Sequence, residues 1–277
     1  CLSAGGHIHL ITVMLITTTE YTLGSAPVTG EGLAVSDHSL DESLAGPVSA
    51  AVFDDEGHSA IEALLEGVAD TEFAQDTLSA LLGDAREPEA WRVGEALAET
   101  YLSIHQNCNF PWPDGRDERK RSSSLPGADL VGFQREGEQE RFAFGEVKTS
   151  GEQSYPPGAV YGRHGLKQQL EDLKDCRAIR DDLVKYLGHR AVSATWRGRY
   201  QAAASVYLRD PSEVRIFGIL VRDVAPHEDD LRARVSSLEK DCPPATAIGL
   251  FALYLPIGRI ANLGRQVMQY RELGGDS

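Results

Sequence analysis

Basic residues are nearly missing from the first third of this 277-residue chain. Residues 1–100 contain only Arg86 and Arg92 against 18 aspartates and glutamates, whereas residues 101–277 hold 25 lysines and arginines against 24 acids. The net charge of −15 therefore belongs to one segment, and the average hides a nearly neutral remainder. Two basic clusters in that remainder, residues 116–121 and residues 197–199, are suited to phosphates or are simply solvated charge.

Cysteine and long apolar runs are also scarce. The four cysteines, at positions 1, 108, 176 and 242, have no C-x-x-C or zinc-type spacing, so we expect reduced thiols in a cytoplasmic protein. The apolar run at residues 8–16 is far shorter than the roughly 20 residues that span a bilayer. No Lys or Arg precedes this run, which favours a buried strand over a signal peptide and predicts no membrane association.

Several common enzyme motifs are missing as well. The chain has no Walker-type glycine-rich loop, no G-x-G-x-x-G after a predicted strand, and no G-x-S-x-G. These absences disfavour an enzyme that acts on small molecules.

The periodicity of the sequence predicts an α/β fold. Residues 22–50, rich in Gly, Ser and Thr, predict loops with at most one further strand. We expect helices over 59–68, 72–82, 87–106, 166–187, 228–240 and 259–272, a hairpin over 129–150 that turns at Gly137, and strands near 203–208, 214–221 and 247–255. This order indicates a mixed central sheet flanked by helices. We divide it into an acidic accessory or partner-binding region, 1–85, and a second domain, 86–277.

The stretch FAFGEVKTS carries the strongest chemical signal. Glu146 and Lys148 lie two residues apart on a predicted strand, so their side chains point to the same face. The apolar run before them is typical of a central buried strand, where two charged groups must pair, bind a metal or take part in chemistry. A second Glu-x-Lys, Glu118 and Lys120, has no apolar neighbours and needs no such explanation. The alternative interpretation of Glu146 and Lys148 is a structural ion pair.

Asp129 begins the preceding strand, so a hairpin places it beside Glu146. The two carboxylates are then able to share a divalent cation, for which hard oxygen ligands are suited. Lys148 would lie near the attacking water or the scissile phosphate. Two carboxylates with a divalent cation and a nearby lysine suit phosphodiester hydrolysis. The alternative for Asp129 is a cap at the start of the strand.

The order Pro126-Gly127-x-Asp129, followed by Glu146-x-Lys148 at a strand end, resembles the PD-(D/E)xK nuclease superfamily over residues 90–187. The sequence departs from that pattern by placing Gly127 and Ala128 between the proline and the aspartate. The resemblance implies a restriction-endonuclease-like fold, DNA as substrate and Mg²⁺ or Mn²⁺ as cofactor.

Two flanking helices extend this resemblance. It implies a metal-supporting glutamate on the helix GEALAE, which is Glu95, although Glu99 lies one turn further on. It also implies a glutamine on the helix LKQQLEDL, which is Gln168 or Gln169. The catalytic set is then Asp129, Glu146, Lys148, Glu95 and Gln168, with Asp129, Glu146 and Glu95 as metal ligands.

The segments PGADLVGF, GEVKTS and YGRHGLKQQ also resemble the nuclease subunit of Hachiman-type anti-phage systems. That resemblance implies a helicase partner, for which acidic residues 1–85 are a suitable surface. We therefore expect a metal-dependent nuclease in anti-phage defence. The alternative is a catalytically inactive subunit that keeps the nuclease-like fold and binds a protein partner through its acidic segment.

Overall fold

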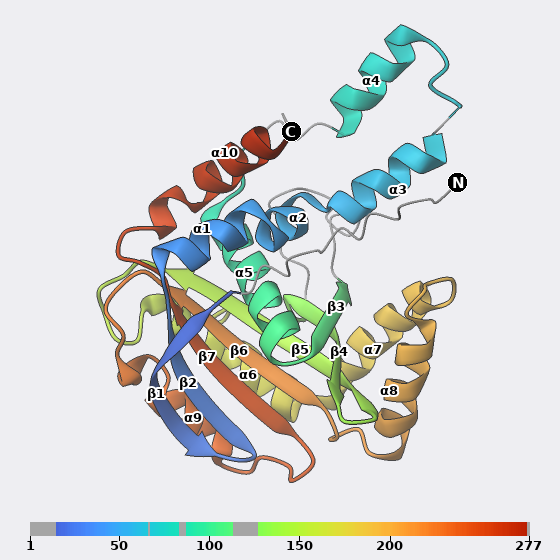
Figure 1. Ribbon diagram of the computed structural model, residues 1–277. Helices are drawn as coiled ribbons and strands as arrows, with labels where there is room; N and C mark the ends of the chain where they lie inside the picture. Colours follow the sequence, from blue (N-terminus) through green and yellow to red (C-terminus); the bar gives the residue numbers. More distant parts are fainter. Residues whose placement is uncertain (1–14, 66, 83–86, 113–126, 276–277) are drawn as a thin grey trace, which may run out of the picture.

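A computed structural model describes residues 15–65, 67–82, 87–112 and 127–275 (Figure 1). Its strands are β1 (Thr17–Ser25), β2 (Val28–Val35), β3 (Cys108–Trp112), β4 (Leu130–Glu136), β5 (Gln139–Ser150), β6 (Arg215–Arg222) and β7 (Ala247–Tyr254). Its α-helices are α1 (Asp37–Ala45), α2 (Pro47–Phe53), α3 (Asp55–Leu65), α4 (Glu72–Leu82), α5 (Ala90–His105), α6 (Leu166–Asp175), α7 (Arg177–Ala191), α8 (Arg197–Arg209), α9 (Arg232–Glu239) and α10 (Leu263–Gly275).

All seven strands form one mixed sheet, in the order β1-β2-β7-β6-β5-β4-β3. Strands β2, β7, β6 and β5 are parallel to one another, whereas β1 and the β5-β4-β3 edge pair in antiparallel fashion. Because β2 pairs with β7, strands from the acidic segment belong to the same sheet as the hairpin. The expected α/β class, with a mixed sheet flanked by helices, is confirmed.

Helices cover both faces of the sheet (Figure 1). One apolar core lies between the sheet and α1, α2, α5 and α10, and it includes Ala143 and Val147 of β5. The other core lies between the sheet and α6, α7, α8 and α9, and it includes Phe142 and Phe144. Neighbouring residues of β5 thus enter opposite cores, as the alternation of side chains along a strand requires. Residues 142–147 are all buried, which explains the continuous apolar run before Glu146.

The predicted hairpin is confirmed, with Gly137 in its turn at φ +59°. The predicted strand at 203–208 is wrong, because this segment lies within α8. Ala203, Val206 and Tyr207 are the buried residues of that helix, at helical rather than alternating spacing. The prediction for residues 22–50 is right in its further strand, which is β2, but wrong in its loops, since the end of β1, helix α1 and the start of α2 occupy most of the remainder. Most of the predicted strand at 8–16 and the whole basic cluster at 116–121 lie outside the described residues.

The single helix predicted over 166–187 is two helices, α6 and α7, separated at Cys176. The buried side chain of Arg180 explains where α6 ends. Its guanidinium donates hydrogen bonds to the main-chain carbonyls of Leu173 (2.5 Å) and Lys174 (2.8 Å). These carbonyls belong to the last turn of α6, where no further helical amide is available to them.

Candidate active site

The β4-β5 hairpin brings Asp129 and Glu146 together. The register pairs Leu130 with Gly145, so the residues directly before and after them also lie opposite one another. The Asp129 amide donates to the Gly145 carbonyl (2.9 Å), and the Asp129 carboxylate Oδ2 accepts from the Val147 amide (2.8 Å). The prediction that the hairpin places these two carboxylates side by side agrees with this register.

Gly127 fixes the approach of the chain to Asp129. Its φ of +117° is a conformation that residues with a side chain rarely adopt, and a Cβ there would lie 3.0 Å from Leu183 of α7. The glycine that departs from the family pattern is therefore required locally. Pro126, on its other side, lies outside the described residues.

Glu146 is fully buried in the face of the sheet that α6 covers. Its neighbour in β6 is Gly218, where a Cβ would come within 2.6 Å of Leu170 from α6. The absence of a side chain at Gly218 lets this helix pack closely beside the carboxylate. Lys148 donates a hydrogen bond to Glu146 Oε1 (2.5 Å), whereas Glu146 Oε2 is buried and accepts no hydrogen bond from a described donor. The Asp129 and Glu146 carboxyls are close enough to share a proton in a hydrogen bond.

Burial sets the protonation of this pair. It raises the pKa of Glu146 to about 9, with a further increase from the charge of Asp129, and the opposing effect of Lys148 is smaller. For Lys148, burial alone would lower the pKa, but the carboxylates of Glu146 and Asp129, with a smaller contribution from Glu95, raise it. Lys148 is therefore a permanent cation near neutral pH, which suits it to stabilise negative charge rather than to accept a proton.

Helix α5 lies against the C-terminal end of β5. A Cβ on Gly94 would meet Thr149 Oγ1, so only glycine allows the helix to approach this strand so closely. Glu95 follows this contact, and its side chain is 15% exposed and forms an ion pair with Arg92 at 3.5 Å. The charge of Glu95 contributes to the rise in the pKa of Lys148, so Glu95 is connected electrostatically with the site.

The two glutamines of α6 differ in their surroundings. Gln168 is exposed and donates a hydrogen bond to Asp172 (2.8 Å) on the surface of the helix. Gln169 is partly buried, and its amide oxygen is buried without a hydrogen-bond partner in the described part of the chain. Gln169 is therefore the better candidate for a functional glutamine, and the sequence alone could not separate the two.

Comparison with protein-family models gives no match to this chain, and comparison with curated proteins gives none either. The assignment of a function therefore rests on the site itself. Among the described residues, no helix is long and apolar enough to cross a membrane.

The oxygen donors of the site determine whether it fits a divalent cation. No group of three His, Cys, Asp or Glu side chains in the described ranges is arranged to hold a metal ion. The site instead offers two adjacent carboxyl groups, and a buried oxygen of Glu146 accepts no hydrogen bond from any described donor. Hard oxygen donors of this kind suit Mg²⁺, which commonly binds through one or two carboxylates and keeps several waters. Asp129 and Glu146 therefore fit the cation, and Glu95 fits a supporting role.

Other candidates from the sequence have different surroundings. Arg163 and His164 are exposed on the loop between β5 and α6. Phe110 is only 6% exposed and belongs to the core on the α5 face, which agrees with packing rather than base stacking. Asp223 ends β6, and its carboxylate accepts the Ile260 amide (3.0 Å), in agreement with a strand-end role. The side chain of Trp112 lies outside the described residues.

Sequence analysis missed a buried charged network at the end of β6. Arg222 is fully buried, and its guanidinium contacts Asp230 (3.3 Å) and donates to the carbonyls of Ser150 (3.0 Å) and Ser154 (2.9 Å). Tyr254 donates to the same oxygen of Asp230 (2.8 Å). The network fixes the chain directly after Lys148. The arginine at the end of the apolar run RIFGILVR was the available signal.

Proposed function

We propose that this protein is a metal-dependent nuclease that hydrolyses phosphodiester bonds in DNA and has a restriction-endonuclease-like fold. The observation that carries the proposal is the fully buried carboxylate of Glu146. Its Oε1 accepts a hydrogen bond from Lys148, its Oε2 accepts none from a donor among the described residues, and the Asp129 carboxyl is close enough for the two acids to share a proton. A purely structural ion pair between Glu146 and Lys148 needs no second carboxyl beside it, whereas two adjacent carboxyls that compete for one proton are suited to share a cation in its place.

The order of the elements also supports the proposal. Helix α5 precedes the hairpin, α6 follows it, and β6 then returns parallel to β5. This agrees with the placement that the resemblance implies for Glu95 and for the glutamine. Participation in anti-phage defence and a helicase partner remain part of the proposal on the strength of the resemblance alone.

The residues of the site have distinct roles in the proposed reaction. In hydrolysis the oxygen of water forms a bond to phosphorus, the P–O bond to the leaving group breaks, and the leaving oxygen takes up a proton. Asp129 and Glu146 would hold the Mg²⁺, which when bound lowers the pKa of water and offsets negative charge. The Lys148 ammonium would orient the water or a phosphate oxygen and stabilise the charge that develops there. The hydrogen bond from the Val147 amide fixes the Asp129 carboxylate in place.

The test is cleavage of labelled linear, supercoiled and single-stranded DNA in Mg²⁺, in Mn²⁺ and in chelator. Glu146→Gln and Lys148→Met keep the approximate size of each side chain, so both variants should fold and both should lose cleavage. The matched control is Glu138→Gln combined with Lys185→Met, which changes an exposed carboxylate and an exposed ammonium outside the site and should keep full activity.

Circular dichroism and thermal unfolding of each variant separate loss of function from loss of fold. Metal-dependent cleavage that persists in both site variants would refute the proposed catalytic role. If the folded wild-type protein does not bind Mn²⁺, the proposed metal site is refuted. This measurement does not depend on any partner protein that cleavage requires.

A further inference from the structure

Helices α3 and α4 extend away from the sheet (Figure 1). Each has 11 residues, and α3 packs on α2. Several of the most exposed large apolar side chains of the described residues lie on α3, α4 and the link between them: Leu64 is 77% exposed, Val68 68% and Phe73 82%. We call residues 59–65 and 67–78 the α3-α4 surface.

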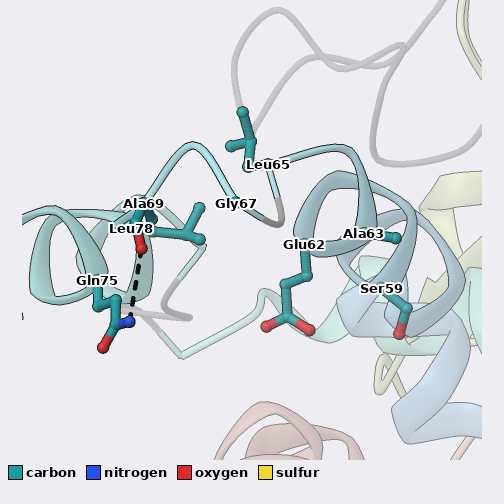
Figure 2. A pocket seen from close by; sticks show the side chains of 8 residues that line it. All are labelled: Ser59, Glu62, Ala63, Leu65, Gly67, Ala69, Gln75 and Leu78. Atoms are coloured by element: carbon teal, nitrogen blue, oxygen red, sulfur yellow. Dashed lines mark hydrogen bonds between the residues drawn. The ribbon is translucent and has the colours of Figure 1, made fainter. Parts of the chain in front are cut away.

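A hollow of about 490 Å³ lies between the two helices (Figure 2). Leu65 of α3 and Leu78 of α4 contribute apolar lining, and Glu62 and Gln75 contribute polar groups. The link that shapes the hollow is held by its own hydrogen bonds. Thr71 Oγ1 accepts the Ala74 amide (3.2 Å) at the start of α4, and the Gln75 amide group donates to the Ala69 carbonyl (3.4 Å). The hollow is thus formed within the chain, and the exposed Leu64 and Phe73 belong to the same two helices that line it.

Helices of this length are only marginally stable in water without packing, because nucleation is costly and few hydrogen bonds follow it. Helices of a globular protein normally bury an apolar stripe, and contiguous exposed apolar patches commonly mark interaction sites. Leu64 and Phe73 are large, and their exposed side chains provide apolar surface that a partner is able to bury. The α3-α4 surface therefore has the properties of a protein-binding surface.

The charge of the α3-α4 surface indicates which kind of partner is able to bind it. Residues 1–85 contain no lysine and no arginine, while Glu62, Asp70, Glu72 and Asp76 are all exposed on this surface. Nucleic acid and anionic membranes would be repelled by this charge. A symmetric contact between two copies of the surface would place carboxylates against carboxylates, which is also unfavourable. A partner surface with apolar side chains in its centre and lysines or arginines around them would complement the α3-α4 surface.

We propose that the α3-α4 surface is a docking site for an amphipathic helix of a partner protein. The apolar side chains of that helix contact Leu64, Leu65, Phe73 and Leu78, and its lysines and arginines pair with the acids at the rim. The proposal is independent of the nuclease activity, because no residue of the Asp129 and Glu146 site takes part in it.

The test uses the full chain and two fluorescent 18-residue peptides of identical Leu and Lys composition. In one peptide the leucines recur at helical spacing, and in the other the order is scrambled so that no apolar face forms. The amphipathic peptide should bind at least tenfold more tightly by fluorescence anisotropy. Leu64→Ser combined with Phe73→Ser should weaken that binding about tenfold, and Glu72→Gln combined with Asp76→Asn should reduce its dependence on salt.

Leu208→Ser is the matched control, because Leu208 is 82% exposed on α8, outside the surface. This variant should bind the peptide like the wild type, and hydrogen exchange should slow on binding within the α3-α4 surface. Equal binding of the scrambled peptide, or unchanged binding by the Leu64 and Phe73 variant, would overturn the proposal. Self-association of the wild-type chain that this variant abolishes would also overturn it, in favour of a second copy as the occupant.

Discussion

Replacement of Glu146 by glutamine should stabilise the metal-free protein at neutral pH. Burial holds the pKa of Glu146 at about 9 in the folded chain, against an ordinary value of 4.5. Between these values the unfolded chain has released the proton while the folded chain retains it. The free energy of unfolding of the wild type therefore falls as pH rises, by about 1.4 kcal/mol per pH unit. By pH 7.5 the accumulated loss is at most about 4 kcal/mol, and glutamine, which does not ionise, avoids it.

Urea unfolding in chelator between pH 5 and pH 8 measures this effect. Glu146→Gln should exceed the wild type by about 3 kcal/mol near pH 7.5 and by less than about 1 kcal/mol near pH 5. Glu138→Gln, at an exposed carboxylate in the hairpin turn, should follow the wild type throughout. A wild-type stability that is constant or rises over this range, or a glutamine variant that is less stable at pH 8, would refute the reasoning.

Added Mn²⁺ supplies the second half of the same experiment. A carboxylate ligand must lose its proton to bind a cation, so metal affinity should increase as pH rises towards the pKa of Glu146. The cation should therefore raise the free energy of unfolding of the wild type more at pH 8 than at pH 6, because only the folded state has the site. Glu146→Gln should show little of this gain. An equal gain in the variant would place the metal elsewhere in the molecule.

Three further substitutions test the surroundings of the site. Arg222→Met should lower the free energy of unfolding by about 3 to 5 kcal/mol, because it leaves Asp230 buried without its cation, and Arg222→Met combined with Asp230→Leu should recover most of the loss in urea unfolding. Gly218→Ala should cost about 1 to 3 kcal/mol in the same assay, since the added methyl meets leucines of α6 and β7, and no loss would contradict this close packing. Gln169→Ala should reduce cleavage while Gln168→Ala leaves it unchanged, and the reverse result would move the functional glutamine to the exposed face of α6.

Local patterns were sufficient to predict the hairpin that carries the site. The apolar run of β5 and the turn at Gly137 are signals within about 20 consecutive residues, so the position of Asp129 opposite Glu146 followed from strand geometry. The burial of Glu146 was also expected from that run. The close packing of α6 beside it was not, because this packing involves Leu170 and Gly218, which are distant in sequence.

Tertiary packing explains why some secondary-structure predictions from the sequence were wrong. The segment at 203–208 has an apolar run with β-branched and aromatic residues, which resembles a strand, but its buried residues face β5 at helical spacing. The glycines of β2 indicated a loop, yet this strand is stabilised by its place between β1 and β7. The break between α6 and α7 depends on Arg180, whose bonds to the end of α6 no periodicity reveals.

The pairing of β2 with β7 also determines when the sheet is able to form during synthesis. Val28 lies opposite Ile248, so β2 has no parallel neighbour until about 220 further residues have been made. At roughly 5 to 20 residues per second, this delay lasts on the order of 10 to 40 seconds. The β4-β5 hairpin, by contrast, has both of its strands available almost at once. We therefore expect Asp129 and Glu146 to meet early on the ribosome, while the β1-β2 hairpin of the acidic segment lacks its parallel neighbour until β7 emerges. The charge of the acidic segment favours its solubility in the meantime.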